Sequence, residues 1–204
     1  MTPFDFLSIG HSNIPPERFV AMLQCAGTHT VADVRSVPAS RHFPWFSKKN
    51  LATLLGDARI GYVAMGDTLG GRPQDARLYR DGVADYEVMA MQPEFRAGIE
   101  QLQDAATGSC VCLLCAEREP LDCHRCLLVA RYLAERGATI GHIPHDGTVE
   151  AHASTERRLL AIEEREADLF ATGQRERLAA AYRRRARAVA YRRTLPAPKA
   201  AKRR

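Results

Sequence analysis

The sequence predicts an α/β fold, in which a parallel sheet is flanked by helices, followed by a basic helical extension. Short apolar runs alternate with amphipathic stretches over residues 4–147, a pattern typical of a parallel sheet between helical layers. The run from Gly108 to Leu114 is almost wholly apolar, as expected for a central strand that is buried on both faces. From about His152 the alternation gives way to a long charged stretch with a basic end.

Five strands are expected, and each is a short apolar run that ends in glycine or in a polar loop. They cover residues 4–9, 30–34, 61–65, 108–114 and 139–143. Helices are expected between them. Pro15 and Pro16 begin the first helix and Gly27 ends it. Ser47 is suited to cap a second helix over residues 48–58.

Two more helices are expected before the last strand. Residues 75–82 predict an irregular polar loop, and residues 85–106 predict a helix interrupted near Pro93. Residues 126–135 predict the other helix, which Gly137 closes.

The C-terminal quarter predicts a different structure. Ser154 or Thr155 is suited to cap one long charged helix that continues to about Arg193, and the proline- and lysine-containing residues after it predict a disordered end. We therefore divide the chain into an α/β domain over residues 1–150 and a basic helical extension over residues 151–204.

The composition limits the class of protein. An apolar fraction of 46% is sufficient for a globular core, and no apolar run approaches the length of a membrane span. The N-terminus does not resemble a secretory signal, so we expect a cytoplasmic protein with no membrane partner. Six cysteines in such a protein are expected to stay reduced. The sequence gives no indication of the oligomeric state.

The charge is unevenly distributed. Between Arg175 and the end there are twelve basic residues and one acid, a net charge of +11, whereas the rest of the chain carries −6. Such asymmetry favours contact with a polyanion. Residues 182–187 and 191–193 interleave tyrosine with arginine, which predicts contact with nucleic-acid phosphates. The alternative is a solvated end that only keeps the protein soluble.

The most informative segment is Cys115-Ala-Glu-Arg-Glu-Pro-Leu-Asp-Cys-His-Arg-Cys126, which follows the most apolar of the expected strands. Polar residues also follow the other strands, at 11–13, 33–35, 70–72 and 145–146. Because the carboxyl ends of parallel strands share one edge of a sheet, we expect all five loops to converge on one crevice.

Six segments resemble the DUF488 family and occur in that family's order. They are Ile9-Gly-His-Ser-Asn13, Asp33-Val-Arg35, Pro38-Ala-Ser-Arg41, Phe46-Ser-Lys48, Leu69-Gly-Gly-Arg72, and Cys115-Ala-Glu117 with Cys123-His-Arg125. The resemblance spans roughly Phe4 to Asp146. It implies a Rossmann-like α/β architecture and a site built from these residues, but it implies no reaction, because the family is an uncharacterised domain of bacteria and archaea. The family pattern lacks Cys126, so the pair formed by Cys123 and Cys126 is expected to be incidental.

Arginines are the clearest chemical indication in the expected crevice. Arg35, Arg41 and Arg72, with Arg125 as a fourth, are expected to bind an anion such as a phosphate, a nucleotide or a nucleic-acid backbone. Other residues expected to contact this ligand are Ser12, Asn13, Ser40, Gly70 and Gly71. The alternative is that each arginine pairs with Asp33, Glu117 or Asp146 and holds the loops together.

Two histidines are candidates for proton transfer. His11 and His124 are expected to act as general acid and base, with Asp33 or Glu117 orienting one of them. In the alternative, His11 caps the turn that follows it through a ring nitrogen. Four aromatic residues are candidates for stacking on a base: Tyr62, Tyr79, Trp45 and Phe46. In the alternative, Trp45 and Phe46 are core residues below a loop.

The clustered cysteines admit three interpretations. Cys115 and Cys123 either support the loop, or act as a nucleophile, or ligate zinc together with His124, in that order of preference. Cys110 and Cys112 alternate along a strand and face away from Cys115, so we expect them to be buried small hydrophobes.

These observations lead to three functional hypotheses. The first is a hydrolase-like enzyme that acts on a phosphate-bearing, nucleotide-like or nucleic-acid substrate, without a cofactor. The second is a non-catalytic module that binds a nucleotide or nucleic acid, and the third is a cysteine-based redox or metal site. The first strand is not followed by Gly-x-Gly-x-x-Gly, which argues against ordinary dinucleotide binding. The chain also lacks Gly-x-x-x-x-Gly-Lys-Ser/Thr, which argues against a P-loop nucleotide hydrolase.

Overall fold

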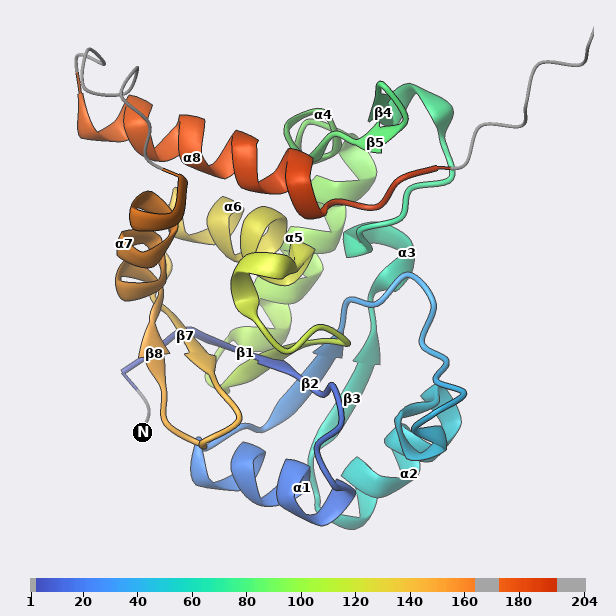
Figure 1. Ribbon diagram of the computed structural model, residues 1–204. Helices are drawn as coiled ribbons and strands as arrows, with labels where there is room; N and C mark the ends of the chain where they lie inside the picture. Colours follow the sequence, from blue (N-terminus) through green and yellow to red (C-terminus); the bar gives the residue numbers. More distant parts are fainter. Residues whose placement is uncertain (1–2, 164–172, 194–204) are drawn as a thin grey trace, which may run out of the picture.

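The computed structural model describes residues 3–163 and 173–193. Its main sheet has the strand order β3-β2-β6-β1-β7-β8 (Figure 1). The strands are β1 (Phe6–Gly10), β2 (Thr30–Asp33), β3 (Gly61–Ala64), β6 (Val111–Cys115), β7 (Ile140–Ile143) and β8 (Glu150–Ala151). The first five are mutually parallel and β8 is antiparallel to β7, which confirms the predicted parallel α/β fold.

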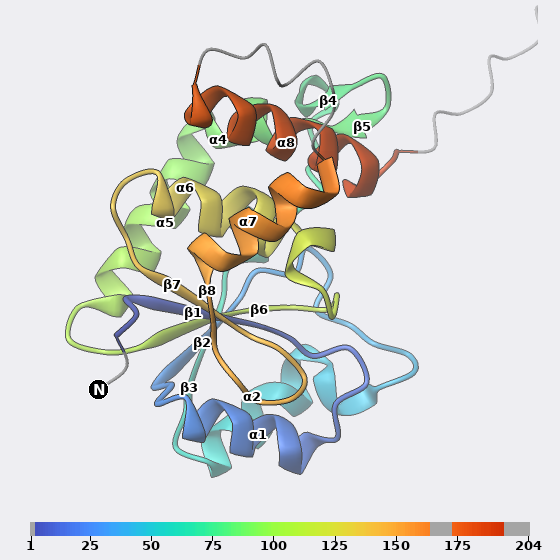
Figure 2. The same ribbon diagram turned by 60° about the vertical axis from the view of Figure 1, so that its left-hand side comes forward.

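Helices cover both faces of this sheet (Figures 1 and 2). The α-helices are α1 (Pro16–Cys25), α2 (Lys48–Asp57), α3 (Gly66–Leu69), α4 (Tyr86–Ala90), α5 (Pro93–Ala106), α6 (Arg131–Ala134), α7 (His152–Glu163) and α8 (Gln174–Val189). Three short 3-10 turns, η1 (Pro44–Phe46), η2 (Ala76–Leu78) and η3 (Pro120–Asp122), and a π-helix, η4 (Arg125–Ala130), complete the helical elements. A small hairpin joins β4 (Tyr79–Arg80) to β5 (Val83–Ala84).

The sheet separates two apolar cores. Helices α1 and α2 pack on one face, where Phe19 and Leu51 meet Leu7 and Leu114. The other core lies under α5, η4 and α6 and contains Leu113 and Cys115. Cys110 and Cys112 belong to the first core and Cys115 to the second, which confirms that the two sets of thiols face opposite sides of the strand.

Several predicted helix boundaries are confirmed. Helix α1 begins at Pro16, and Gly27 follows it with a φ of 73°. Ser47 occupies the N-cap position of α2, although its side chain makes no capping hydrogen bond. The helix expected over residues 85–106 is interrupted at Pro93, which begins α5. The loop expected over residues 75–82 contains η2 and the strand β4, so part of it is regular.

The prediction of one long C-terminal helix is wrong. Two helices, α7 and α8, pack side by side on the layer formed by η3, η4 and α6, and α8 ends at Val189 (Figure 2). Each contributes to the core: Leu159 from α7 and Ala181 and Tyr182 from α8 are buried there. A single straight helix would leave one of these apolar faces in water. The disordered end expected after Arg193 lies outside the described residues.

A buried chain of hydrogen bonds connects the C-terminal helices to the sheet. Ser8 Oγ donates to His142 Nδ1 (2.6 Å), and His142 Nε2 donates to His152 Nδ1 (2.9 Å). His152 Nε2 donates to the hydroxyl of Tyr182 (3.0 Å), which donates to Glu156 (3.0 Å). Every donor has one acceptor, so the chain is satisfied with both imidazoles neutral. Burial lowers the pKa of both histidines, to about 4 for His152.

Arginines of α8 pair with acidic residues of the same chain. Arg185 pairs with Asp122 and Arg187 with Asp81 at 2.6 Å, both in the α/β domain, and Arg184 pairs with Glu163 of α7. Tyr182, which was expected to flank a nucleic-acid backbone, is instead buried in the core. The charge asymmetry of the sequence is therefore partly an internal complementarity between a basic helix and an acidic domain. In the part of the chain that is described, no helix is long and apolar enough to cross a membrane.

Candidate functional site

The loops that follow β1, β2, β3 and β6 surround a cavity of about 270 Å³ at the carboxyl edge of the sheet. Nine of the residues predicted for the site line it: His11, Arg35, Ser40, Gly71, Arg72, Cys115, Glu117, Cys123 and His124. The fifth loop is not part of the lining. Its His145 instead lies with Nε2 3.1 Å from the carbonyl oxygen of Gly10.

Two thiols, a carboxylate and an imidazole converge in this cavity. The thiol of Cys115 donates to Oε2 of Glu117 at 2.8 Å, and Sγ of Cys123 lies 3.2 Å from the same oxygen. Nδ1 of His124 lies 3.7 Å from Sγ of Cys115 and 3.9 Å from Sγ of Cys123. We call these four residues the Cys-Glu-His centre.

The imidazole of His124 is held in one orientation. Its Nε2–H donates to the carbonyl oxygen of Val34 at 2.9 Å, which leaves Nδ1 with a lone pair directed at the thiols. Gly71 makes this position possible, because a Cβ at residue 71 would lie 2.7 Å from Cγ of the ring. The Gly70-Gly71 turn, which was expected to approach an anion, thus approaches protein atoms: Gly70 packs on Ser36 and Gly71 on His124.

Arg125 holds the loop that carries the centre. Its guanidinium is buried and donates to the carbonyl oxygens of Glu117 (2.7 Å) and Arg118 (3.0 Å). Gly10 faces the same carbonyl so closely that a Cβ there would lie 1.7 Å from the oxygen of Glu117. Arg125 does not line the cavity, so its contacts are those of a bracing residue and not of a ligand-binding one.

The two thiols of the Cys-Glu-His centre differ in pKa. Burial, together with the neighbouring Cys123, raises the pKa of Cys115 well above its ordinary value. Burial also disfavours a thiolate at Cys123, but the hydrogen bond with Cys115 and the charge of Arg125 outweigh it and hold the pKa of Cys123 well below its ordinary value. Burial opposes the charged form of His124, but Cys123, the carbonyl of Val34 and Glu117 together outweigh it and raise the pKa of His124.

Arg35 is engaged within the protein. Its Nε donates to Oδ1 of Asp33 (2.8 Å), its Nη2 to Oδ2 (2.6 Å) and its Nη1 to the carbonyl oxygen of Phe46 (2.8 Å). Tyr62 donates to the same carboxylate at 2.8 Å. Asp33 does not line the cavity, and it orients Arg35 rather than a histidine. This arrangement is the pairing alternative of the sequence analysis.

Both ring nitrogens of His11 are also occupied. Nδ1 donates to the carbonyl oxygen of Ser12 at 3.0 Å, Nε2 accepts from Nη1 of Arg35 at 3.1 Å, and the ring stacks on Phe46 with 4.1 Å between centroids. Burial lowers the pKa of His11 to about 4, with a further contribution from Arg35. A neutral ring with both nitrogens engaged fits the capping alternative better than proton exchange with a ligand.

The remaining predicted ligand residues lie in different places. Arg72 is exposed at the cavity and its guanidinium lies 5.0 Å from the ring centroid of Tyr191. Ser40 lines the cavity and accepts the N–H of Phe43. Ser12, Asn13 and Arg41 are outside the lining.

Sequence reasoning missed part of the cavity wall. Ser36, Tyr86, Val189 and Tyr191 all contribute to it. Tyr191 arrives because residues 190–193 run beside the hairpin: its carbonyl oxygen accepts the N–H of Ala84 at 2.9 Å. No local sequence pattern predicts that Tyr191 reaches the cavity, since its position depends on how α8 folds back over the domain. Of the four aromatic candidates, Phe46 is a core residue, and none lines the cavity.

The Cys-Glu-His centre has the donor types of a zinc site. Its four ligand atoms all lie within 4.8 Å of one another. Atoms bound tetrahedrally at zinc–sulfur and zinc–nitrogen distances of 2.3 and 2.0–2.1 Å are separated by about 3.5 Å, close to the sulfur–nitrogen distances of 3.7 and 3.9 Å observed here. The bond from His124 to Val34 is the kind of outer contact that orients a ligating histidine.

A second group of donors, Cys126, His142 and His152, also converges. Its two imidazoles are hydrogen-bonded to each other in the satisfied chain described above, so this group has a structural explanation.

The fold and the site define an α/β protein with a cysteine- and histidine-containing centre at the carboxyl edge of its sheet. Residues 15–133 match the family described as "Domain of unknown function DUF488". The match covers more than half of the chain, which therefore belongs to the DUF488 family, as its motifs predict. No curated protein and no solved structure matches the chain.

Proposed function

We propose that the protein is a metal-dependent hydrolase whose Cys-Glu-His centre binds zinc, and that it acts on a phosphate-bearing substrate. The observation that carries this proposal is the convergence of two thiols, an imidazole nitrogen and a carboxylate oxygen within 4.8 Å in a cavity. Catalytic zinc sites commonly have three firm protein ligands and a fourth position that exchanges. Cys115, Cys123 and His124 are suited to the firm positions.

Glu117 is suited to the exchangeable position. A bound zinc ion supplies Lewis acidity and lowers the pKa of its bound water to about 7. With zinc held by Cys115, Cys123 and His124, the Glu117 carboxylate would accept a proton from the attacking water and return it to the alcohol that leaves as the ester P–O bond breaks.

The substrate class rests on the residues at the mouth of the cavity. Arg72 is the exposed guanidinium of the lining, and its contact with the ring of Tyr191 leaves its N–H groups available to an anion. Arg35 supplies little attraction because Asp33 neutralises it. Of the three arginines that were expected to bind an anion, Arg72 is thus the one that remains available at this cavity.

Metal analysis of the purified protein tests the proposal. We expect about one zinc per chain in the wild type, the same content in Cys25→Ser, whose thiol is exposed and outside the centre, and loss of the metal in Cys123→Ser. Cobalt substitution should give thiolate-to-metal absorption in the first two proteins only. Hydrolysis of a chromogenic phosphodiester should stop with a chelator and return with zinc. Wild-type protein that binds neither zinc nor cobalt would refute the proposal.

One observation favours a second candidate, in which Cys123 is a nucleophile. The backbone N–H of Arg125 donates to Sγ of Cys123 at 3.4 Å, an arrangement that stabilises a thiolate. In that case iodoacetamide should abolish activity and chelators should not. The metal proposal expects the opposite response to chelators, and bound zinc should protect Cys123 from alkylation.

A further inference from the structure

The last described residues extend the small sheet that β4 and β5 form, beside the cavity of the Cys-Glu-His centre (Figure 1). Val83 of β5 pairs antiparallel with Arg192, and the N–H of Ala84 donates to the carbonyl oxygen of Tyr191 at 2.9 Å. Because successive side chains of an extended segment point to opposite faces, Tyr191 and Arg193 lie on one face and Arg192 lies on the other.

Two arginines and two tyrosines meet on the face that carries Tyr191. The guanidinium of Arg72 lies 5.0 Å from the ring centroid of Tyr191, and that of Arg193 lies 5.9 Å from the ring centroid of Tyr79. Burial raises the pKa of Tyr79 and so does the neighbouring Tyr191, whereas the charges of Arg193 and Arg72 lower it. The four side chains therefore form one cluster. We call Arg72, Tyr79, Tyr191 and Arg193 the Arg-Tyr strip.

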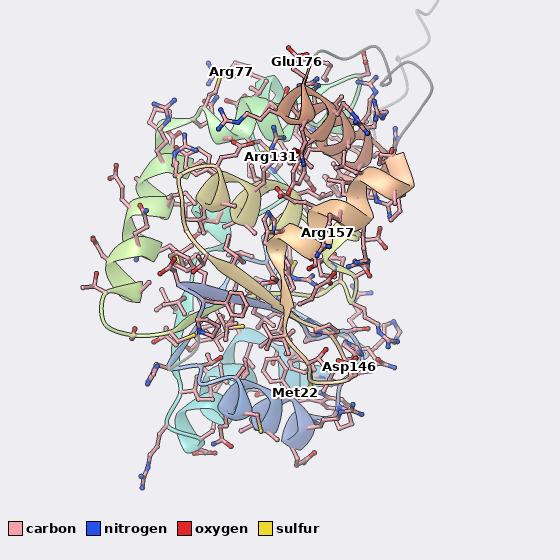
Figure 3. The ribbon with its side chains drawn as sticks, turned by 90° about the vertical axis from the view of Figure 1, so that its left-hand side faces the viewer. Met22, Arg77, Arg131, Asp146, Arg157 and Glu176 are labelled. Carbon is pink, nitrogen blue, oxygen red and sulfur yellow. The ribbon has the colours of Figure 1, made fainter. Side chains whose placement is uncertain are left out.

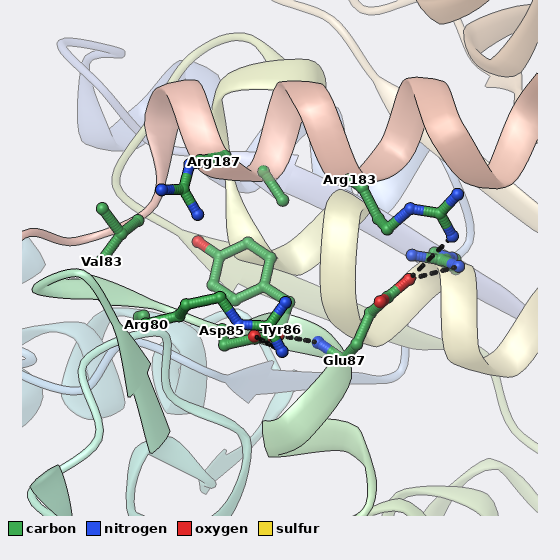
Figure 4. A pocket seen from close by; sticks show the side chains of 10 residues that line it. Arg80, Val83, Asp85, Tyr86, Glu87, Arg183 and Arg187 are labelled. Atoms are coloured by element: carbon green, nitrogen blue, oxygen red, sulfur yellow. Dashed lines mark hydrogen bonds and ion pairs between the residues drawn. The ribbon is translucent and has the colours of Figure 1, made fainter. Parts of the chain in front are cut away.

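Both guanidiniums of the Arg-Tyr strip lack an acidic partner. Arg72 and Arg193 are exposed, and within residues 3–163 and 173–193 no carboxylate lies at ion-pair distance from either of them. The neighbouring cavity between α8 and the segment from β4 to α4 is different. Each of the four arginines that line it is paired with a carboxylate, as Arg80 is with Asp85 at 3.1 Å (Figure 4). Positive charge is thus available to a ligand at the strip.

The Arg-Tyr strip continues from the cavity of the Cys-Glu-His centre to the surface. Arg72 and Tyr191 line this cavity, whereas Tyr79 and Arg193 lie outside the lining. A ligand in contact with the whole strip therefore extends beyond the cavity, as a chain of phosphates does and a single phosphate does not. The ring of Tyr191 is 40% exposed, which leaves apolar area for a second kind of contact.

We propose that the Arg-Tyr strip binds a single-stranded nucleic acid, with phosphates on Arg72 and Arg193 and a base against the ring of Tyr191. Guanidinium forks match phosphate oxygens in pairs. Bases of a single strand are free to stack on aromatic side chains, whatever their sequence. This inference names a substrate class for the proposed function, and it rests on that function for turnover alone. Binding along the strip does not require the metal.

Fluorescence anisotropy of a short fluorescein-labelled single strand tests the proposal, with ATP and the matching duplex as unlabelled competitors. The test variant is Arg72→Gln/Arg193→Gln. The matched control is Arg96→Gln/Arg157→Gln, which removes the same charge from α5 and α7 (Figure 3). Both control arginines are exposed, line neither cavity and have no carboxylate at ion-pair distance within the described residues. The two double variants therefore differ in position and not in charge.

We expect Arg72→Gln/Arg193→Gln to bind the strand at least about tenfold more weakly, because hydrogen bonds between charged groups are lost. The slope of log affinity against log salt should decrease by about 1.4, since each phosphate contact on a single strand contributes about 0.7. The control should keep the affinity and slope of the wild type. Tyr191→Leu should weaken binding about fivefold or more through lost stacking, and Tyr191→Phe should not. Equal losses in both double variants, displacement by ATP or duplex as effective as by the unlabelled strand, or no binding to the wild type would overturn the proposal.

Failure of this inference and failure of the metal proposal give different results. Arg72→Gln/Arg193→Gln should keep the zinc content of the wild type, and Cys123→Ser should lose zinc but keep its affinity for the strand. Wild-type protein without zinc that still binds the strand through Arg72 and Arg193 would refute the metal proposal alone. Affinity that disappears in Cys123→Ser and persists in Arg72→Gln/Arg193→Gln would refute the strip and assign the strand to the Cys-Glu-His centre.

Discussion

Replacing Arg35 by methionine tests whether this arginine binds a ligand or holds the fold. The substitution keeps an unbranched side chain and removes the charge. Asp33 is 1% exposed, so its carboxylate would remain buried with Tyr62 and one backbone N–H as its hydrogen-bond donors. Phe46 and His11 would each lose the hydrogen bond that Nη1 donates.

The geometry sets the size of the effect. Two unit charges 2.6 Å apart attract each other by about 6 kcal/mol at an effective dielectric constant of 20. The cost of burying both charges offsets much of this energy in the intact pair. Removing one partner leaves the cost for the other, which amounts to about 3–5 kcal/mol of unfolding free energy. For a protein of this size that corresponds to a decrease in melting temperature of about 6–20 °C.

Urea unfolding followed by far-ultraviolet circular dichroism measures this loss. The double variant Asp33→Asn/Arg35→Met should be more stable than Arg35→Met, because it no longer buries an unpaired charge. The reasoning would be refuted if Arg35→Met lost less than about 1 kcal/mol, the scale of an exposed ion pair, while ligand affinity fell sharply. That outcome would indicate that Arg35 binds the anionic ligand.

Two further predictions concern histidines. Gly71→Ala should push a methyl group into the ring of His124, and we expect weaker zinc binding with a nearly unchanged far-ultraviolet spectrum, measured by competition with a chromogenic chelator. His152 has a folded-state pKa of about 4, below its ordinary value of 6.5. The unfolded chain therefore binds the extra proton between these values, and the stability that neutral His152 contributes is present above pH 6.5 and lost as the pH falls toward 4. His152 contributes a slope of at most about 1.4 kcal/mol per pH unit to the free energy of unfolding. Urea unfolding of His152→Gln across the same pH window should not show this contribution.

The fold was largely predictable because its signals are local. The apolar run before Cys115 and the prolines at the start of α1 and α5 determine their elements within a few residues of chain. The parallel sheet then brings the loops after β1, β2, β3 and β6 to one edge, so residues as distant as His11 and His124 could be assigned to one place. The family motifs indicated the same loops.

The use of each arginine was not predictable from the sequence. Arg35 and Arg72 occur in similar polar loops, yet one is buried against Asp33 and the other is exposed at the cavity. The difference depends on the depth of each side chain relative to the sheet, which a linear pattern does not encode. The partners of the basic helix were unpredictable for a similar reason, because charge in a sequence does not tell whether its partner is another molecule or the same chain. Arg185 on Asp122 and Arg187 on Asp81 are examples.

The wall that Val189 and Tyr191 contribute to the cavity has a consequence for the family. The family match ends at residue 133, and the wall comes from residues more than fifty positions later. A fragment cut at the family boundary would lose this wall and the buried contact between Tyr182 and His152. The four residues of the Cys-Glu-His centre all lie inside the family region, so such a fragment would keep the centre's residues and leave one side of the cavity open to solvent.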